Sequence, residues 1–439
     1  MDYFINTTTD HLSSTGGIAL VGKIFEKIRF GKSDNHQKVK HPEILRAMAG
    51  LFVQGRNRFE EIRLFRDDDF YQKSLGLDFV PAAETLRLYL EQMMPEKLNV
   101  EKHISSCNLN LLKQTRLTSE TIDCRSYLPV DIDTSPLDNS KSKKEGVSRT
   151  YKNFDGYHPI FAYVGMEGYL LGCQLREGKQ HCQKGTPAFL ESVIDSVNQI
   201  RAKRNILFRL DGGNDSLDTM KVLANSGHFF LVKRNLRKEK REYWLDIAEA
   251  EGIITQKSAR KTVYTGVHTG RTPAGDPEFP ETDIIFEVTE RYYAKDGTKL
   301  LIPEIEVQTF WTNLYESPET VLDLYHKHGT SEQFHSELKT DMNVERLPSG
   351  KFAVNALLLQ IAMISFNTLR FIGQQVLALE SELPYKPTVL RKRLRKVIDD
   401  LIRIAVKVVS HSRRVILKLW EHDPWYPCFQ RLYSICQAL

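Results

Sequence analysis

The spacing of apolar residues changes twice along the chain, and the first part has the spacing of amphipathic helices. Up to about residue 120 the apolar positions recur every three or four residues, as on one face of a helix. Pro81 precedes the last of these segments, and proline is common where helices begin. We expect helices at Glu43–Gln54, Arg58–Leu64, Asp68–Ser74 and Ala82–Met93. The pattern predicts a helical domain over residues 1–120.

The last two of these helices flank a tight turn, Leu75–Asp78, as in a helix-turn-helix. In that arrangement Arg87 would be exposed on the final helix and available to DNA. Helical bundles that contact no DNA share the pattern, so both interpretations stay open here.

From about Leu128 the apolar residues alternate with polar ones, which is the spacing of a strand. Asp131 and Asp133 alternate with Val130 and Ile132, so both carboxylates leave this strand on one face. Further strands are expected at Pro159–Val164, Tyr169–Leu175, Ile206–Leu210 and His228–Lys233, and helices at Phe189–Ala202 and Leu217–Asn225. This order predicts an α/β fold, a mixed sheet with helices on its faces, over residues 121–234.

Residues 235–312 are polar and rich in Thr, Tyr and Val, and they predict an antiparallel β insertion. Asp296-Gly297 is a strong signal for a hairpin turn within it. The expected strands are Lys238–Glu251, Lys261–Gly270, Thr282–Tyr293 and Lys299–Phe310.

Residues 313–380 are expected to return to the core as helices. Ser317 is suited to cap a helix and Pro318 to occupy its first position. The most apolar run, Phe352–Ile372, is interrupted by polar residues, which predicts a buried core helix and no membrane span. Residues 381–439 are expected to form basic C-terminal helices.

A helical stretch in this region would gather several polar side chains. Within a sector of roughly 60° it would present four of them: Tyr325, His328, Glu332 and Lys339. Phe334 and Leu338 would anchor the opposite face, and Gly329 predicts a break in the helix. The alternative is an ordinary amphipathic helix with a polar face in solvent.

Three carboxylates stand at the ends of predicted elements. Asp133 lies on the first strand, Asp211 follows a later short strand, and Glu332 lies on the helical stretch. Oxygen ligands of this kind suit Mg²⁺ or Mn²⁺. Two such ions can hold both the attacking and the leaving oxygen of a phosphoryl displacement. Asp131 is an alternative first ligand, and we prefer Asp133.

Positive charge is concentrated near the C-terminus. The chain carries a net charge of +5, but residues 386–420 hold eleven Lys or Arg against two Asp, a local net of +9. Such a segment favours a polyanionic partner, most often nucleic acid, although a solvated basic helix has the same composition. Arg391, Arg393 and Arg395 are therefore candidate DNA contacts.

Six cysteines without C-x-x-C spacing indicate neither a zinc site nor a disulfide framework. Together with a polar start that does not resemble a signal peptide, they predict a reducing, cytoplasmic location.

The spacing of the four polar residues matches a known signature, Y-(2)-R-(3)-E-(6)-K, with His328 where the pattern has arginine. Further blocks agree in order: Val130–Ser135, Phe208–Gly213, Phe310–Leu314 and Arg346–Ser349. Through these blocks residues 40–380 resemble the DDE transposases of bacterial insertion sequences.

The resemblance implies an RNase H-like core, an N-terminal domain that binds the element's terminal repeats, and cut-and-paste transposition of double-stranded DNA by a homodimer in the bacterial nucleoid. It implies that Asp133, Asp211 and Glu332 hold the metal ions, and that Tyr325 and Lys339 contact phosphates. His328 would make a weaker, pH-dependent phosphate contact, or serve as a neutral hydrogen-bonding residue. The alternatives are a catalytically inactive DNA-binding derivative and a metal-dependent nuclease of the same fold.

Overall fold

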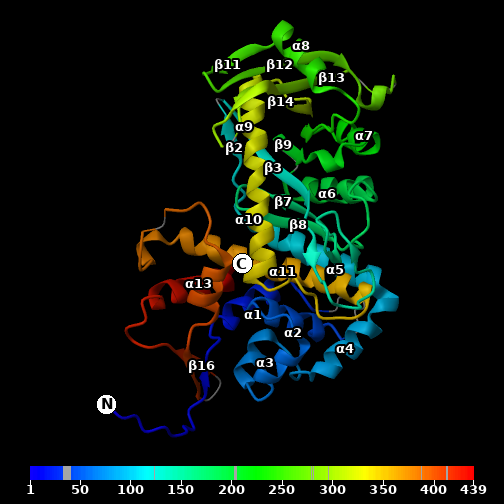
Figure 1. Cartoon of the computed structure of the whole chain (residues 1–439). Coiled ribbons are helices and arrows are strands. Elements are labelled where there is room, and N and C mark those ends of the chain that lie inside the picture. The colour runs from blue at the N-terminus through cyan, green and yellow to red at the C-terminus, as the bar shows by residue number, and fades with distance from the viewer. Residues whose placement is uncertain are drawn as a thin grey trace.

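The computed structural model describes residues 1–32, 41–122, 124–201, 205–277, 279, 281–294, 296–386, 388–411 and 414–439, except the side chain of residue 274. Figure 1 shows an elongated molecule with helices at one end, a large sheet in the middle and a β layer at the other end. A helical column that contains α9 (Pro318–His326) and α10 (Ser331–Ser336) runs lengthwise beside the sheet.

The N-terminal part is a bundle of helices, as predicted. Its α-helices are α1 (Ile18–Lys27), α2 (Glu43–Phe52), α3 (Asp69–Leu75), α4 (Ala83–Gln92) and α5 (Lys97–Lys113), with 3-10 helices at Phe59–Phe65 and Met94–Glu96. The side chain of Asp68 caps α3 by accepting a hydrogen bond from the Tyr71 amide, and Gly76 ends the helix at a φ of 62°.

A 10-stranded mixed sheet forms the centre of the molecule, in the order β11-β12-β13-β14-β10-β9-β3-β7-β8, with β2 beside β3. Its central strands are β2 (Glu120–Ile122), β3 (Arg125–Thr134), β7 (Ile160–Val164), β8 (Tyr169–Gln174), β9 (Asn205–Leu210) and β10 (Phe229–Lys233). Strands β3, β9 and β10 are parallel, whereas β7 and β8 are antiparallel to their neighbours. The α/β prediction is thereby confirmed as a mixed sheet.

Two helices cover this part of the sheet: α6 (Thr186–Arg201) and α7 (Leu217–Asn225). The expected last residue of the first of them, Ala202, lies outside the described residues. A small separate sheet, in the order β4-β6-β5, extends beyond the end of β3. It consists of β4 (Leu137–Asp138), β5 (Ser148–Arg149) and β6 (Asp155–Tyr157).

The predicted β insertion contains one helix that the sequence analysis assigned to a strand. Residues 241–251 form α8 (Arg241–Glu251), whose buried Trp244, Ile247 and Ala248 have the three- and four-residue spacing of a helix face. Four strands follow: β11 (Ile253–Lys257), β12 (Lys261–Arg271), β13 (Thr282–Tyr293) and β14 (Lys299–Thr312). Strand β14 pairs with β13 and with β10, so the insertion continues the central sheet.

Helix α11 (Phe352–Leu377) packs between the N-terminal helices and the sheet, against α2, α5 and β8. It is the one described helix with the length and composition to cross a membrane, and 83% of its most apolar window is buried inside the protein. The burial agrees with the predicted core helix.

The C-terminal part is not purely helical, contrary to expectation. Its elements are α12 (Leu394–Val397), a π-helix (Ile398–Ile402), β15 (Val406–His411), β16 (Arg414–Lys418) and α13 (Tyr426–Ala438). Buried Val406 and Val408 alternate with partly exposed residues, the pattern of a strand. Strand β15 pairs with β1 (Leu12–Ser13), so both ends of the chain share one small sheet.

Candidate active site

Three carboxylates that lie far apart in the sequence line one cavity of about 620 Å³: Asp133, Asp211 and Glu332. Strands β3 and β9 are parallel neighbours in which Ile132 is the register partner of Leu210. The residue that follows each of these two is an acid: Asp133 lies within β3, and Asp211 comes directly after the end of β9. Glu332 approaches from α10, where its side chain is exposed.

The two aspartates influence each other's ionisation. Burial and the negative charge of Asp133 raise the pKa of Asp211. One oxygen of Asp211 accepts a hydrogen bond from the Asn214 amide at 2.6 Å. Although burial alone would raise the pKa of Asp133, a hydrogen bond from His335 lowers it. The two neighbouring carboxylates, Asp133 and Asp211, concentrate negative charge in this part of the cavity.

His335 holds Asp133 from the side of α10. Its Nε2 lies 3.1 Å from Oδ2 of Asp133, and its Nδ1 lies 3.0 Å from the hydroxyl of Tyr163. The sequence analysis missed this residue. A signal was available, because His335 follows Glu332 by three residues and so lies on the adjoining face of the same helix.

Asp131 has a different role from Asp133. Both of its oxygens accept hydrogen bonds from Arg209, at 2.6 Å and 2.8 Å, and Oδ1 also lies 2.7 Å from Nδ1 of His328. The side chain is 3% exposed. Because its oxygens are already engaged in a buried ion pair, this placement favours Asp133 over Asp131 as the metal ligand.

His328 is buried beside Asp131, although it also lines the cavity. The guanidinium of Arg209 extends the cluster by donating to Oε1 of Glu120 at 2.9 Å and to the Leu324 carbonyl at 2.8 Å. This geometry supports the hydrogen-bonding interpretation of His328, and its phosphate contact stays a prediction. The cluster attaches the end of α9 to β3 and β9.

Lys339 and Tyr325 line the same cavity as the carboxylates. The ammonium of Lys339 donates to the Pro136 carbonyl at 2.7 Å, and burial lowers its pKa. The ring of Tyr325 packs against that of Phe310 with centroids 4.5 Å apart. Their phosphate contacts remain predictions.

The helical column changes its winding twice near these residues. A 3-10 turn at Lys327–Thr330 contains Gly329, which confirms the predicted break. A π-helix at Glu337–Asp341 carries Lys339 and was not predicted. Single π turns inside helices are frequent at functional sites because they shift the side chains that follow. Phe334 and Leu338 are both 1% exposed and anchor the column, as expected.

The residues present suit a divalent cation by their chemistry. Three carboxylates line one cavity, and the charge of Asp133 disfavours ionisation of Asp211, a repulsion that a bound cation would relieve. Within the described part of the chain, no three acidic, histidine or cysteine side chains already stand close enough to hold a metal ion together. Glu332 is the exposed member of the three, whereas Asp133 and Asp211 are half-buried.

The predicted DNA-binding arginines all have protein partners. Arg87 pairs with Glu84 and Glu60 on the N-terminal bundle. The other three connect the C-terminal segment to the column: Arg391 with Glu337, Arg393 with Asp341, and Arg395 with the Thr340 carbonyl. Their contacts with DNA stay predictions, and the side chains of Arg87, Arg393 and Arg395 keep 42–57% exposure.

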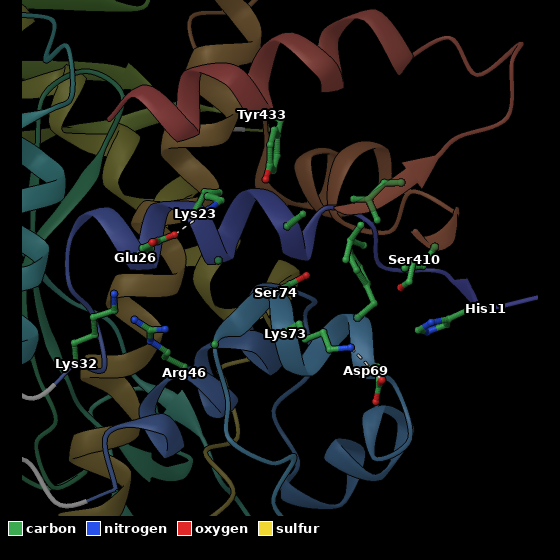
Figure 2. A pocket seen from close by; sticks show the side chains of 17 residues that line it. His11, Lys23, Glu26, Lys32, Arg46, Asp69, Lys73, Ser74, Ser410 and Tyr433 are labelled. Carbon is green, nitrogen blue, oxygen red and sulfur yellow. Dashed lines mark hydrogen bonds and ion pairs between the residues drawn. The ribbon is translucent and has the colours of Figure 1, made fainter. Parts of the chain in front are cut away.

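A second cavity, of about 490 Å³, lies between α1, α3 and the antiparallel pair β15–β16, and Figure 2 shows the side chains that line it. Its charges are largely compensated, because Lys23 pairs with Glu26 and Lys73 pairs with Asp69. Arg46 donates to the carbonyls of residues 30 and 75, just beyond α1 and at the end of α3. Each of these ion pairs lies within one helix, whereas the Arg46 hydrogen bonds join separate segments of the bundle. The described residues of the lining gather no set of carboxylates like that of the first cavity, so the first cavity is the candidate site.

Three comparisons place the chain among known proteins. A family profile described as Transposase DDE domain group 1 matches residues 4–439. No curated protein matches the chain. Among seven solved chains that match is one described as a cryo-EM structure of a piggyBac transposase synaptic complex with hairpin DNA. It shares 11% identity over 88% of this chain and 78% of that one, with a TM-score of 0.44.

Proposed function

Since the chain belongs to the DDE transposases, we propose that it cuts DNA at the ends of a mobile element and joins the freed 3′ ends to target DNA. The observation that carries this proposal is the convergence of Asp133, Asp211 and Glu332 on one cavity. Lys339 and Tyr325 line that cavity as well, which is the arrangement expected for a site that binds metal ions and DNA phosphates together.

The topology supports an RNase H-like catalytic core. The strand order β8-β7-β3-β9-β10, with the first two strands antiparallel and the last three parallel, places two acids at the ends of adjacent strands. We propose further that the N-terminal helical bundle binds the terminal repeats of a bacterial insertion sequence, that a homodimer pairs the two ends, and that the protein acts on DNA in the cytoplasm.

Asp133, Asp211 and Glu332 would hold two Mg²⁺ or Mn²⁺ ions. When bound, these ions supply charge stabilisation to the attacking and leaving oxygens of the phosphodiester. The residues of the chain position the DNA strand and the ligands. His335 fixes the orientation of the Asp133 carboxylate. Lys339 offers an ammonium, a compact donor that suits a phosphate oxygen.

The test is nicking of supercoiled plasmid with Mg²⁺ or Mn²⁺, comparing the wild type with Asp211→Ala and with Asp218→Ala. Asp218 is an exposed acid on the nearby α7 and serves as the matched control. We expect the wild type and Asp218→Ala to nick DNA and Asp211→Ala to lose at least 10²-fold in rate, about 3 kcal/mol of barrier. Equal nicking by all three proteins would contradict the metal site.

The same assay separates the two alternatives. Donor DNA covalently joined to a target plasmid identifies a transposase, whereas cut products alone identify a nuclease of the same fold. DNA binding without cutting by the wild type identifies a catalytically inactive derivative.

A further inference from the structure

A short turn between β5 and β6 reaches the same cavity as the carboxylates. The amide of Thr150 donates to the Phe154 carbonyl at 2.9 Å, and the amide of Asn153 donates to the Thr150 carbonyl at 3.0 Å. Asn153 has a φ of 62°, a conformation that asparagine tolerates in tight turns. These bonds hold Tyr151 and Lys152 at the tip of the turn, where both line the cavity.

Tyr151 is an aromatic residue exposed at this site. It is 61% exposed, and its ring centroid lies 5.1 Å from that of His158, which is buried beneath it. Burial of its hydroxyl and the negative charges of Asp133 and Asp211 raise the pKa of Tyr151 to about 12. The hydroxyl therefore stays protonated at neutral pH, and the His158 ring packs against the Tyr151 ring at an interplanar angle of 51°.

Lys152 has no carboxylate partner among the described residues. Its ammonium lies 5.8 Å from the centroid of the Tyr151 ring. Lys152 and Lys339 both line the cavity. Burial lowers the pKa of Lys339, Glu345 opposes this effect, and the positive charge of Lys152 adds to it. Two lysines therefore line one cavity, and no acid among the described residues forms an ion pair with Lys152.

A DNA strand that enters this cavity must bring its phosphates close to three carboxylates. The repulsion is relieved by bound cations and by protein cations around the phosphate. Lys339 supplies one such charge from the helical column, and Lys152 supplies another from the β5–β6 turn. An exposed tyrosine beside a phosphate site is also suited to stack on a nucleobase, because every base has a flat face.

We propose that the Tyr151–Lys152 turn is a second contact for the DNA strand at the cut site. Lys152 binds a backbone phosphate together with Lys339, and the ring of Tyr151 stacks on an adjacent unpaired base. This inference rests on the proposed function, because it takes DNA as the ligand of this cavity.

The test is fluorescence anisotropy with the full-length protein and a labelled duplex that carries a single-stranded overhang, over a series of KCl concentrations and without divalent metal. For Lys152→Gln we expect the slope of log K against log[KCl] to become shallower by about 0.9, or by about 0.7 if the contacted phosphate lies in the overhang. The matched control is Lys143→Gln, an exposed lysine nearby that does not line the cavity, and it should keep the wild-type slope.

For Tyr151→Ala we expect binding to the overhang duplex to weaken about tenfold, and for Tyr151→Phe to remain within about twofold of wild type, because phenylalanine keeps the stacking face. A blunt duplex of the same sequence should show little effect of either change. Thermal melting of each variant confirms that the fold is intact.

The outcome separates this inference from the proposed function. An unchanged slope for Lys152→Gln would overturn the inference, even if the wild type nicks plasmid normally. A shallower slope confined to Lys152→Gln would support it, even if no cutting is detected. A wild type that binds neither duplex would overturn it as well.

Discussion

Nδ1 of His328 lies 2.7 Å from Oδ1 of Asp131, and Arg209 holds both oxygens of that carboxylate from the neighbouring strand. The signature position at which the family has arginine is thus occupied by a residue engaged in a buried cluster. An arginine nevertheless enters this cluster, from β9 instead of the helical column.

The first prediction concerns this cluster. We expect Asp131→Ala to reduce the free energy of unfolding by about 3 kcal/mol, because Arg209 would lose a buried partner. His328→Ala should cost about 2 kcal/mol, the value of a hydrogen bond to a charged group. Urea denaturation measures both. If His328→Ala instead left stability unchanged and lowered the salt slope of DNA binding by about 0.9, His328 would contact a phosphate directly.

The second prediction concerns Asp211 and pH. Its pKa is raised above the ordinary value of 3.8 in the folded protein, so the folded state holds this proton more tightly than the unfolded chain does. Ionisation of Asp211 therefore costs stability as the pH rises above 3.8 and through the folded-state pKa. We expect Asp211→Asn to raise the melting temperature by about 2 °C at neutral pH.

The rise in melting temperature of Asp211→Asn should shrink as the pH falls below the folded-state pKa of Asp211, because the wild-type side chain is then also neutral. Melting curves at several pH values test this, with Asp218→Asn as an exposed control. A gain that is the same at acidic and neutral pH would contradict the assignment.

The third prediction concerns metal ions. Saturating MgCl₂ should stabilise the wild type against unfolding by about 3 kcal/mol at a hundredfold excess over Kd, because only the folded protein brings the carboxylates together. Asp133→Ala should lose this stabilisation, whereas Asp218→Ala should keep it. Calorimetric titration with MnCl₂ gives an independent measure of the same site. Equal stabilisation of Asp133→Ala would place the ion elsewhere.

The fourth prediction separates two glutamates on one helical column. Glu337 is buried and accepts hydrogen bonds from Arg370 and the Leu394 amide, each at 3.0 Å. Glu337→Ala should cost about 4 kcal/mol of stability because it leaves a buried guanidinium unpaired. Glu332 is exposed, so Glu332→Ala should change stability by no more than about 0.5 kcal/mol while abolishing nicking. A Glu332→Ala protein that is destabilised but still nicks DNA would exclude Glu332 as a metal ligand.

Local spacing was enough to predict α2, α3, α4, strands β3 and β7 to β10, and the break at Gly329, but it did not give α1 or α5. It failed at Lys238–Glu251, where residues typical of strands concealed the helical spacing of Trp244, Ile247 and Ala248. It also failed at β15. The positive charge of this region led to a prediction of basic helices, although Val406 and Val408 alternate as in a strand. In both places burial against a neighbouring element decides the structure.

The candidate site likewise combines residues that the sequence order predicts with contacts that depend on the fold. The order of acids at element ends predicted Asp133, Asp211 and Glu332, and all three line one cavity. The ion pair of Asp131 with Arg209 depends on the pairing of β3 with β9, because that register sets the two residues opposite each other. No spacing within either strand specifies that register. The partners of Arg391 and Arg393 likewise come from the folding of the C-terminal segment onto the column.

Strand β14 is bonded to β13 on one side and to β10 on the other. Excision of residues 235–312 would therefore leave β10 as a bare outer strand beside Asp211, with unpaired amides and carbonyls ready to capture strands from other molecules. A related protein without this insertion would need another feature that prevents edge-to-edge pairing at β10, such as a bulge, a charged strand or a covering helix. The β layer thus protects the sheet that carries Asp133 and Asp211 from self-association.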